Sequence, residues 1–191
     1  MDRRAMAVAV IAAAGGMLLF MRGAQAAMNT TGSGQITGGQ VGNQSQALLP
    51  YRNFRTFDSL FIAAGQKWGV DPMVLKAISL QESSLNPRAA NVSNPSDPSY
   101  GLMQMSCMPD GQGGCLANEF NLVGWPPASQ AALFDPATCI DLGAQLLAQN
   151  LRATGGNTPQ AVAMYNSGST YDPAYVAAVQ QFYSEMGGGQ L

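Results

Sequence analysis

Glu82 is the residue whose type and position in this sequence most strongly suggest chemistry. It shares a helical spacing with Leu75, Ile78 and Leu85, so its carboxyl group falls on a helix face that should be buried. Burial disfavours the charged form and raises the pKa of a carboxyl group. A carboxylic acid that is protonated near neutral pH can protonate the leaving oxygen of a glycosidic bond. The same spacing also fits a glutamate at the edge of the apolar stripe that extends to solvent.

The amino-acid composition excludes several classes of catalytic site and of binding partner. The 191 residues include no histidine, which removes Ser-His-Asp and Cys-His catalysis and every zinc site with a histidine ligand. Three cysteines without a Cys-x-x-Cys pair do not suggest a zinc or redox site. Outside residues 1–26 the chain has 6 basic and 10 acidic residues, a net charge of −4. This balance argues against nucleic acid and against an anionic lipid surface as partners.

The N-terminus has the pattern of an export signal over residues 1–26. Charged residues at 2–4 precede an apolar run from Ala5 to Met21, and Ala24-Gln25-Ala26 resembles a cleavage site. A retained N-terminal anchor is the alternative, although the run is shorter than the roughly 20 residues of a spanning helix. Residues 27–50 are rich in Gly, Gln and Ser, and we expect them to form a flexible linker.

One mainly helical domain is predicted over residues 51–186. Proline follows Asp or Thr at 71–72, 135–136, 158–159 and 172–173, and each pair precedes a segment with helical apolar spacing, as helix N-caps do. Predicted helix ends fall at Gly69, Asn86-Pro87, Gly155-Gly156 and the glycines after Met186. No stretch alternates clearly between apolar and polar residues, so any strands are short. Residues 187–191 are predicted to form a flexible tail.

Three short motifs supply the other candidate polar groups. Ser83 follows Glu82 directly, Gly101-Leu102-Met103-Gln104 places an amide among apolar residues, and a Tyr165-Asn166 pair precedes Ser167-Gly168. The amides and the phenol can hydrogen-bond sugar hydroxyls, N-acetyl groups or a carboxylate. A surface glutamine, a core tyrosine and a C-cap asparagine are the plainer interpretations of the same residues.

Together, these motifs resemble the lytic transglycosylases of the soluble Slt type, which share their fold with goose-type lysozymes. The resemblance extends over about residues 57–183 and implies a mainly α, lysozyme-like domain with a substrate groove. The chain departs from the family pattern in three places. The segment 89–100 is longer, Met105-Ser106-Cys107-Met108-Pro109 stands where Ile-Met-Pro is common, and Cys139 stands where an asparagine is common.

The resemblance implies a reaction without water. Glu82 would protonate the oxygen between N-acetylmuramic acid and N-acetylglucosamine, and would then take a proton from the C6 hydroxyl of the same muramyl sugar. That hydroxyl would attack the anomeric carbon and give a 1,6-anhydromuramoyl end. No metal or organic cofactor is implied. The other implied roles are a hydrogen bond from Tyr165 to Glu82 or the substrate, a groove lined by Gln104 and Asn166, and a groove shaped by Ser83 and Met103.

Two alternatives remain open. A goose-type muramidase would use Asp97 to hold a hydrolytic water, although Asp97 lies within Asn94-Pro95-Ser96-Asp97-Pro98, a sequence typical of a turn. The second alternative is an inactive glycan-binding or structural component of a wall-crossing machine. The presence of Glu82 with all three motifs argues against it.

The cysteines and the cellular setting complete the sequence-based expectations. Cys107 and Cys115 bracket a short glycine-rich loop that can close as a disulfide in an exported protein, which leaves Cys139 as a small buried residue. The resemblance implies peptidoglycan glycan strands as the substrate, in the periplasm or cell envelope of a bacterium or in a phage particle. A secretion, conjugation, pilus or flagellar apparatus, or a phage crossing the wall, fits the sequence equally.

Overall fold

The computed structural model describes residues 51–191 except 52, 118, 169 and 170. The predicted signal peptide and linker, over 1–50, lie outside the described residues. Within the described part, the chain forms five α-helices, one 3-10 helix and three two-residue strands. The prediction of a mainly helical domain with short strands is therefore confirmed.

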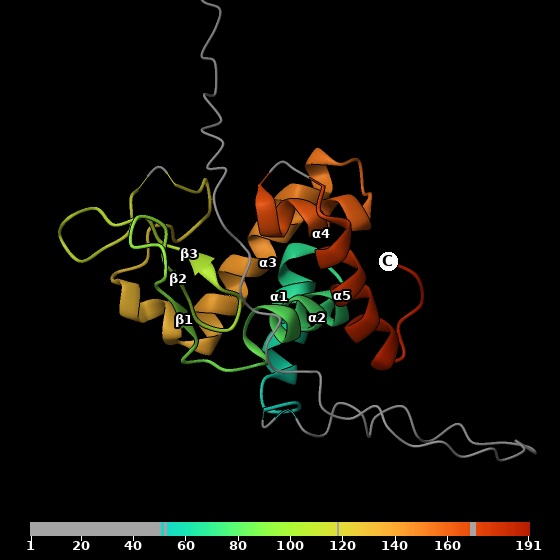
Figure 1. The fold of residues 1–191 in the computed structure, drawn as a ribbon. Coiled ribbons are helices and arrows are strands. Elements are labelled where there is room, and N and C mark those ends of the chain that lie inside the picture. The colour runs from blue at the N-terminus through green and yellow to red at the C-terminus, as the bar shows by residue number, and fades with distance from the viewer. Residues whose placement is uncertain (1–50, 52, 118, 169–170) are drawn as a thin grey trace, which may run out of the picture. The chain divides into compact units, whose positions relative to one another are not determined.

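Helix α3 runs between the strands and the remaining helices (Figure 1). It contacts β3 and η1 on one side and α1, α2 and α4 on the other, and α5 packs on α2 and α4. The helices are α1 (Asp58–Trp68), α2 (Pro72–Ser83), η1 (Gln130–Phe134), α3 (Pro136–Ala153), α4 (Thr158–Ser167) and α5 (Pro173–Glu185).

Aspartate N-caps start three of these helices, as the sequence predicts. The side chains of Asp71, Asp135 and Asp172 accept hydrogen bonds from backbone N–H groups of the first turn, and a proline follows each of them. The fourth helix, α4, starts one residue earlier than its Thr-Pro pair suggests. Its cap is Asn157, whose side chain accepts a hydrogen bond from the backbone N–H of Gln160 at 3.0 Å.

Helix α2 ends at Ser83, before the predicted stop at Asn86-Pro87. Ser84 and Leu85 both have left-handed backbone conformations, with φ of 53° and 59°. Leu85 is fully buried, and its carbonyl accepts a hydrogen bond from Asn53 Nδ2 at 2.9 Å. Burial of this leucine and the bond to its carbonyl explain why the chain leaves the helix early. Glu82 therefore lies in the last turn of α2.

The three strands form a small antiparallel sheet in the order β1 (Ala90–Asn91), β2 (Ser99–Tyr100) and β3 (Met105–Ser106). Tyr100 is paired with Ala90 on one side and with Met105 on the other. The loop between β1 and β2 contains the predicted turn, in which the N–H of Asp97 donates to the carbonyl of Asn94 at 3.1 Å. The turn between β2 and β3 is Gly101–Gln104, the segment singled out in the sequence.

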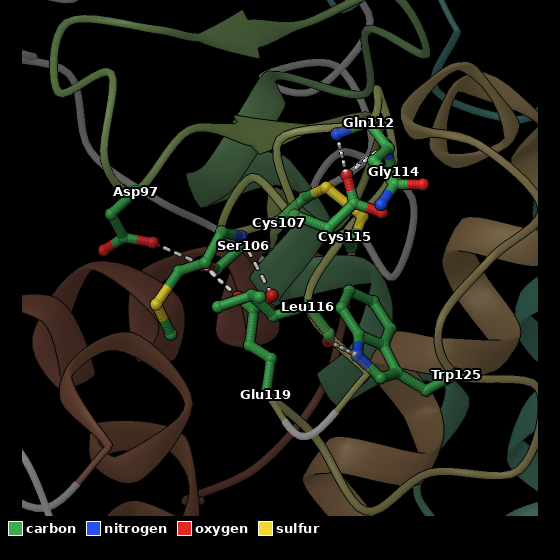
Figure 2. The surroundings of a disulfide bond; sticks show 11 residues. Asp97, Ser106, Cys107, Gln112, Gly114, Cys115, Leu116, Glu119 and Trp125 are labelled. Carbon is green, nitrogen blue, oxygen red and sulfur yellow. Dashed lines mark hydrogen bonds between the residues drawn. A yellow bond between two sulfur atoms is a disulfide. The ribbon is translucent and has the colours of Figure 1, made fainter.

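The Cys107–Cys115 disulfide is present and closes the loop that follows β3 (Figure 2). Inside this loop, Asp110 Oδ1 accepts hydrogen bonds from the N–H groups of Gln112 and Gly114. Glu119 fastens the loop to β3, because its carboxylate accepts from Ser106 Oγ at 2.6 Å and from the N–H of Met108 at 2.9 Å. The third cysteine, Cys139, is free and fully buried in the second turn of α3.

Removal of the disulfide should lower the stability of the domain. Replacing Cys107 and Cys115 together by serine frees a loop of sequence separation 8 in the unfolded chain. We expect the free energy of unfolding to fall by about 2–3 kcal/mol, as the loop-closure entropy of so short a loop implies. Urea unfolding of the purified variant and the parent measures the difference. An unchanged urea midpoint would show that the disulfide adds no stability.

Candidate active site

Glu82 lies at the C-terminal end of α2, next to α5. Leu75 and Ile78, its neighbours on the same helix face, are completely buried, whereas Glu82 is half-buried. The hydroxyl of Tyr175, on α5, donates a hydrogen bond to Glu82 Oε1 at 2.5 Å, across 93 residues of sequence. The packing of α2 against α5 therefore fixes one oxygen of this carboxyl group.

The surroundings of Glu82 keep its proton available near neutral pH. Burial raises the pKa of Glu82 from 4.5 to about 7, and the hydrogen bond from Tyr175 lowers it by a smaller amount. No hydrogen bond holds Oε2 among the described residues, and none of their buried side-chain oxygens lacks a partner. Oε2 is therefore not completely buried. Tyr175 holds one oxygen, and the other has no hydrogen-bond partner among the described residues, which suits a group that gives and takes a proton.

The Gly101–Gln104 turn lies beside Glu82 and is fixed from three helices. The carbonyl of Leu102 accepts hydrogen bonds from Ser79 Oγ at 3.0 Å and Ser83 Oγ at 2.8 Å, both on α2. The N–H of Met103 donates to the sulfur of Cys139 on α3 at 3.3 Å. Tyr165 on α4 donates its hydroxyl proton to the carbonyl of Met103 at 2.9 Å. The motif predicted from the sequence is therefore a point where α2, α3 and α4 meet.

Gln104 and Met103, two residues of this turn, make contacts mainly within the protein. The Nε2 of Gln104 donates to the carbonyl of Gly101 at 2.9 Å, and its Oε1 accepts from Ser99 Oγ at 3.2 Å. The side chain of Met103 is completely buried, so it can shape a groove only from beneath. Ser83 is half-buried and holds the turn through Leu102 rather than pointing freely into a groove.

Tyr165 is close to Glu82 but is not its hydrogen-bond partner. Its hydroxyl is engaged by the carbonyl of Met103, and it also lies 3.5 Å from the sulfur of Met105. Burial, followed by the nearby charge of Glu82, raises the pKa of the Tyr165 phenol well above its usual value. The hydrogen bond to Glu82 that was expected from Tyr165 comes instead from Tyr175.

The described domain matches a known family. The transglycosylase SLT domain family covers residues 59–182, which include Glu82, the Gly101–Gln104 turn, Tyr165 and Tyr175. The chain belongs to this family. A comparison with curated proteins finds no match. The matched range agrees with the resemblance over residues 57–183.

SLT domains act on peptidoglycan, so family membership assigns a lytic transglycosylase type of activity and an extracytoplasmic place of action. None of the helices in the described part of the chain combines the length and the hydropathy that a membrane span requires.

Tyr175 is the residue of this SLT domain that the sequence-based site omitted. It belongs to the apolar stripe of α5, and a buried phenol hydroxyl usually has a hydrogen-bond partner, which was the available signal. Asn166, predicted to contact substrate, donates from Nδ2 to Asp172 Oδ2 at 3.2 Å. Because Asp172 is the N-cap of α5, Asn166 fixes the start of the helix that carries Tyr175.

Asp97 lies beside Ser106 and does not hydrogen-bond Glu82. It is exposed and lies within hydrogen-bond distance of Ser106 Oγ, whose single hydroxyl proton is shared between the carboxylates of Asp97 and Glu119 (Figure 2). Burial raises the pKa of Glu119, and the charge of Asp97 contributes to the same direction. In the described residues Asp97 makes no hydrogen bond to Glu82, and it is not among the groups that shift the pKa of Glu82.

Substitution of Tyr175 by phenylalanine should raise the pKa of Glu82 further. The variant loses the hydrogen bond that stabilises the carboxylate, while the ring still fills its place in the core. We expect the alkaline limb of the pH–activity profile to move to higher pH, because Glu82 keeps its proton longer. The rate at neutral pH should fall about 10-fold, because the carboxyl group is no longer held in place by a hydrogen bond. Cell-wall clearing measured from pH 5 to pH 9 tests this, with Tyr183→Phe as a control because Tyr183 bonds Asp71 instead. An unmoved limb would contradict the role given to Tyr175.

Proposed function

We propose that this chain cleaves the bond between N-acetylmuramic acid and N-acetylglucosamine in peptidoglycan without water, and leaves 1,6-anhydromuramoyl ends. The observation that carries the proposal is the environment of Glu82. Burial raises its pKa to about 7, the hydrogen bond from Tyr175 lowers it by a smaller amount, and no second carboxylate is among the causes. Most glycosidases that use water or a covalent intermediate have a pair of carboxyl groups at the reacting centre. A lone acid fits a reaction in which the sugar supplies its own nucleophile.

The proposed reaction uses one proton twice. Protonated Glu82 donates to the glycosidic oxygen, the bond from the muramyl anomeric carbon to that oxygen breaks, and N-acetylglucosamine leaves with a free hydroxyl group. The Glu82 carboxylate then takes the proton from the C6 hydroxyl as O6 bonds to the anomeric carbon. The carboxylic acid is restored and no water is consumed. Tyr175 holds Oε1 throughout, which directs the proton transfers to Oε2.

The remaining predicted site residues support this centre in different ways. We propose that Gln104 and Asn166 border the groove, since both are half-buried, and that Ser83 and Met103 shape it by holding the turn in place. The export signal over 1–26 would carry the domain to the wall, and the linker over 27–50 would give it reach. A secretion, conjugation, pilus or flagellar apparatus, or a phage particle, is the proposed type of partner.

Product analysis tests the proposed reaction. Purified sacculi are digested with the enzyme, and the released muropeptides are separated and weighed by mass spectrometry. We expect products that are lighter by one water than the reducing-end products of a muramidase digest run in parallel. Reducing ends alone would instead establish the goose-type muramidase, and Asp97→Asn would then be the variant to compare. No release at all would favour a glycan-binding component.

A further inference from the structure

Two small residues on α3 face the centre of the site. Cys139 and Gly143 lie one helical turn apart and are both buried. The sulfur of Cys139 accepts the hydrogen bond from the Met103 N–H. A methyl group added at Gly143 would lie 2.9 Å from two side-chain carbons of Met103 and 2.9 Å from the hydroxyl oxygen of Tyr165. This face of α3 therefore touches both Met103 and Tyr165.

Met103 and Tyr165 depend on each other for their positions. The only acceptor within normal hydrogen-bond distance of the Tyr165 hydroxyl among the described residues, apart from a methionine sulfur, is the carbonyl of Met103 at 2.9 Å. The Met103 N–H lies in the same planar peptide as the Leu102 carbonyl, so Cys139 on one side and Ser79 and Ser83 on the other fix that plane. The next peptide plane joins it at the Met103 Cα and carries the carbonyl that the Tyr165 hydroxyl binds.

Cys139 suits this place because it both accepts and donates. Its sulfur accepts from Met103 and lies 3.7 Å from the carbonyl of Tyr100, toward which the thiol proton can point. Burial raises the pKa of the Cys139 thiol to about 12, so the group stays protonated at neutral pH. An alanine at this position would leave the fully buried N–H of Met103 without an acceptor.

The position of Tyr165 bears on Glu82. Burial and then the charge of Glu82 raise the pKa values of Tyr165 and Tyr175, and Tyr165 also raises that of Tyr175, so the three groups lie close enough to interact. Burial is the main cause of the raised pKa of Glu82. If Tyr165 moves, more water can reach the half-buried carboxylate, and the pKa of Glu82 falls towards its ordinary value.

We propose that Cys139 and Gly143 are positioning residues of the active site. Cys139 holds the Met103 N–H and Gly143 leaves room for the Met103 side chain and the Tyr165 hydroxyl, and through these groups they limit the access of water to Glu82. The proposal rests on the function proposed above for Glu82, although its first measurement does not require any activity.

The first experiment measures the titration of Glu82 itself. The carboxyl carbon of Glu82 is followed by NMR as a function of pH in the full chain, with Glu82→Gln used to assign the signal. Cys139→Ala and Gly143→Ala should each move the titration of Glu82 to lower pH, whereas Cys139→Ser keeps a donor and an acceptor and should leave it close to that of the parent. An unmoved titration in both alanine variants overturns the proposal, whether or not the enzyme makes anhydro products.

The second experiment separates positioning from loss of stability. Wall-digestion kinetics of Cys139→Ala and Gly143→Ala should show kcat lowered about 10-fold with KM little changed, which corresponds to about 1.4 kcal/mol of lost transition-state stabilisation. Leu142→Ala is the matched control, because Leu142 is as buried on α3 but adjacent to Gly143 in sequence and so points about 100° away. It should lower the unfolding temperature while the titration of Glu82 stays in place. A shift in Leu142→Ala equal to that of the two test variants would show a merely structural effect and overturn the proposal.

Discussion

Glu82→Gln should abolish wall cleavage while the domain remains folded. The amide keeps an oxygen that can accept the hydrogen bond from Tyr175. It has no acidic proton to transfer to the glycosidic oxygen, and it is not basic enough to take one from a sugar hydroxyl. Because the same carboxyl group serves as acid and as base in the proposed reaction, we expect the rate to fall by at least about 1,000-fold. The release of soluble muropeptides from purified sacculi measures the loss. Clearing at the rate of the parent enzyme would contradict the catalytic role of Glu82.

The stability of the same variant provides its control. The pKa of Glu82 is higher in the folded state than its ordinary 4.5, so the folded state binds the proton more tightly than the unfolded state. The stabilising contribution is complete below pH 4.5 and is lost as the pH rises through about 7. Glutamine does not ionise, so Glu82→Gln should match the parent near pH 4.5 and exceed it at pH 8. The gain should be about 2 kcal/mol, given that Glu82 is only half-buried. Urea unfolding at both pH values measures it, and a variant less stable at pH 8 would contradict the raised pKa.

Gly101→Ala should prevent the domain from folding stably. Gly101 has a φ of 76°, and a methyl group there would lie 2.0 Å from the carbonyl oxygen of Leu133 and 2.8 Å from the sulfur of Cys139. Neither contact can be relieved by a flexible side chain, because one atom is backbone of η1 and the other is a buried thiol on α3. We expect a loss of more than about 4 kcal/mol in the free energy of unfolding. Circular dichroism and urea unfolding of the purified protein measure it.

Gly111→Ala separates the clash from the backbone strain. Gly111 has nearly the same backbone conformation, with a φ of 79°, but open space surrounds the place of the added methyl group. This variant should therefore lose only about 1 kcal/mol, the ordinary cost of a left-handed alanine. If the two alanine variants were equally stable, the close approach of Gly101 to η1 would have no energetic consequence.

Local chemistry allowed the sequence to predict several features of this SLT domain. Asp71, Asp135 and Asp172 start helices because a short acidic side chain followed by proline satisfies the first N–H groups, whatever the rest of the fold does. The Cys107–Cys115 disulfide follows in the same way from a short loop rich in glycine. The sequence predicts the end of α2 at Asn86-Pro87, but the helix ends at Ser83 because the burial of Leu85 decides where it stops.

Residue spacing within single segments was enough to predict the helical class, the family motifs and the position of Glu82 on an apolar helix face. Which side chains come into contact depends instead on how the helices pack. Tyr175 rather than Tyr165 reaches Glu82, and Asp97 lies on Ser106. A hydrogen bond across 93 residues depends on how α5 packs against α2, and residue spacing along the chain does not specify that packing.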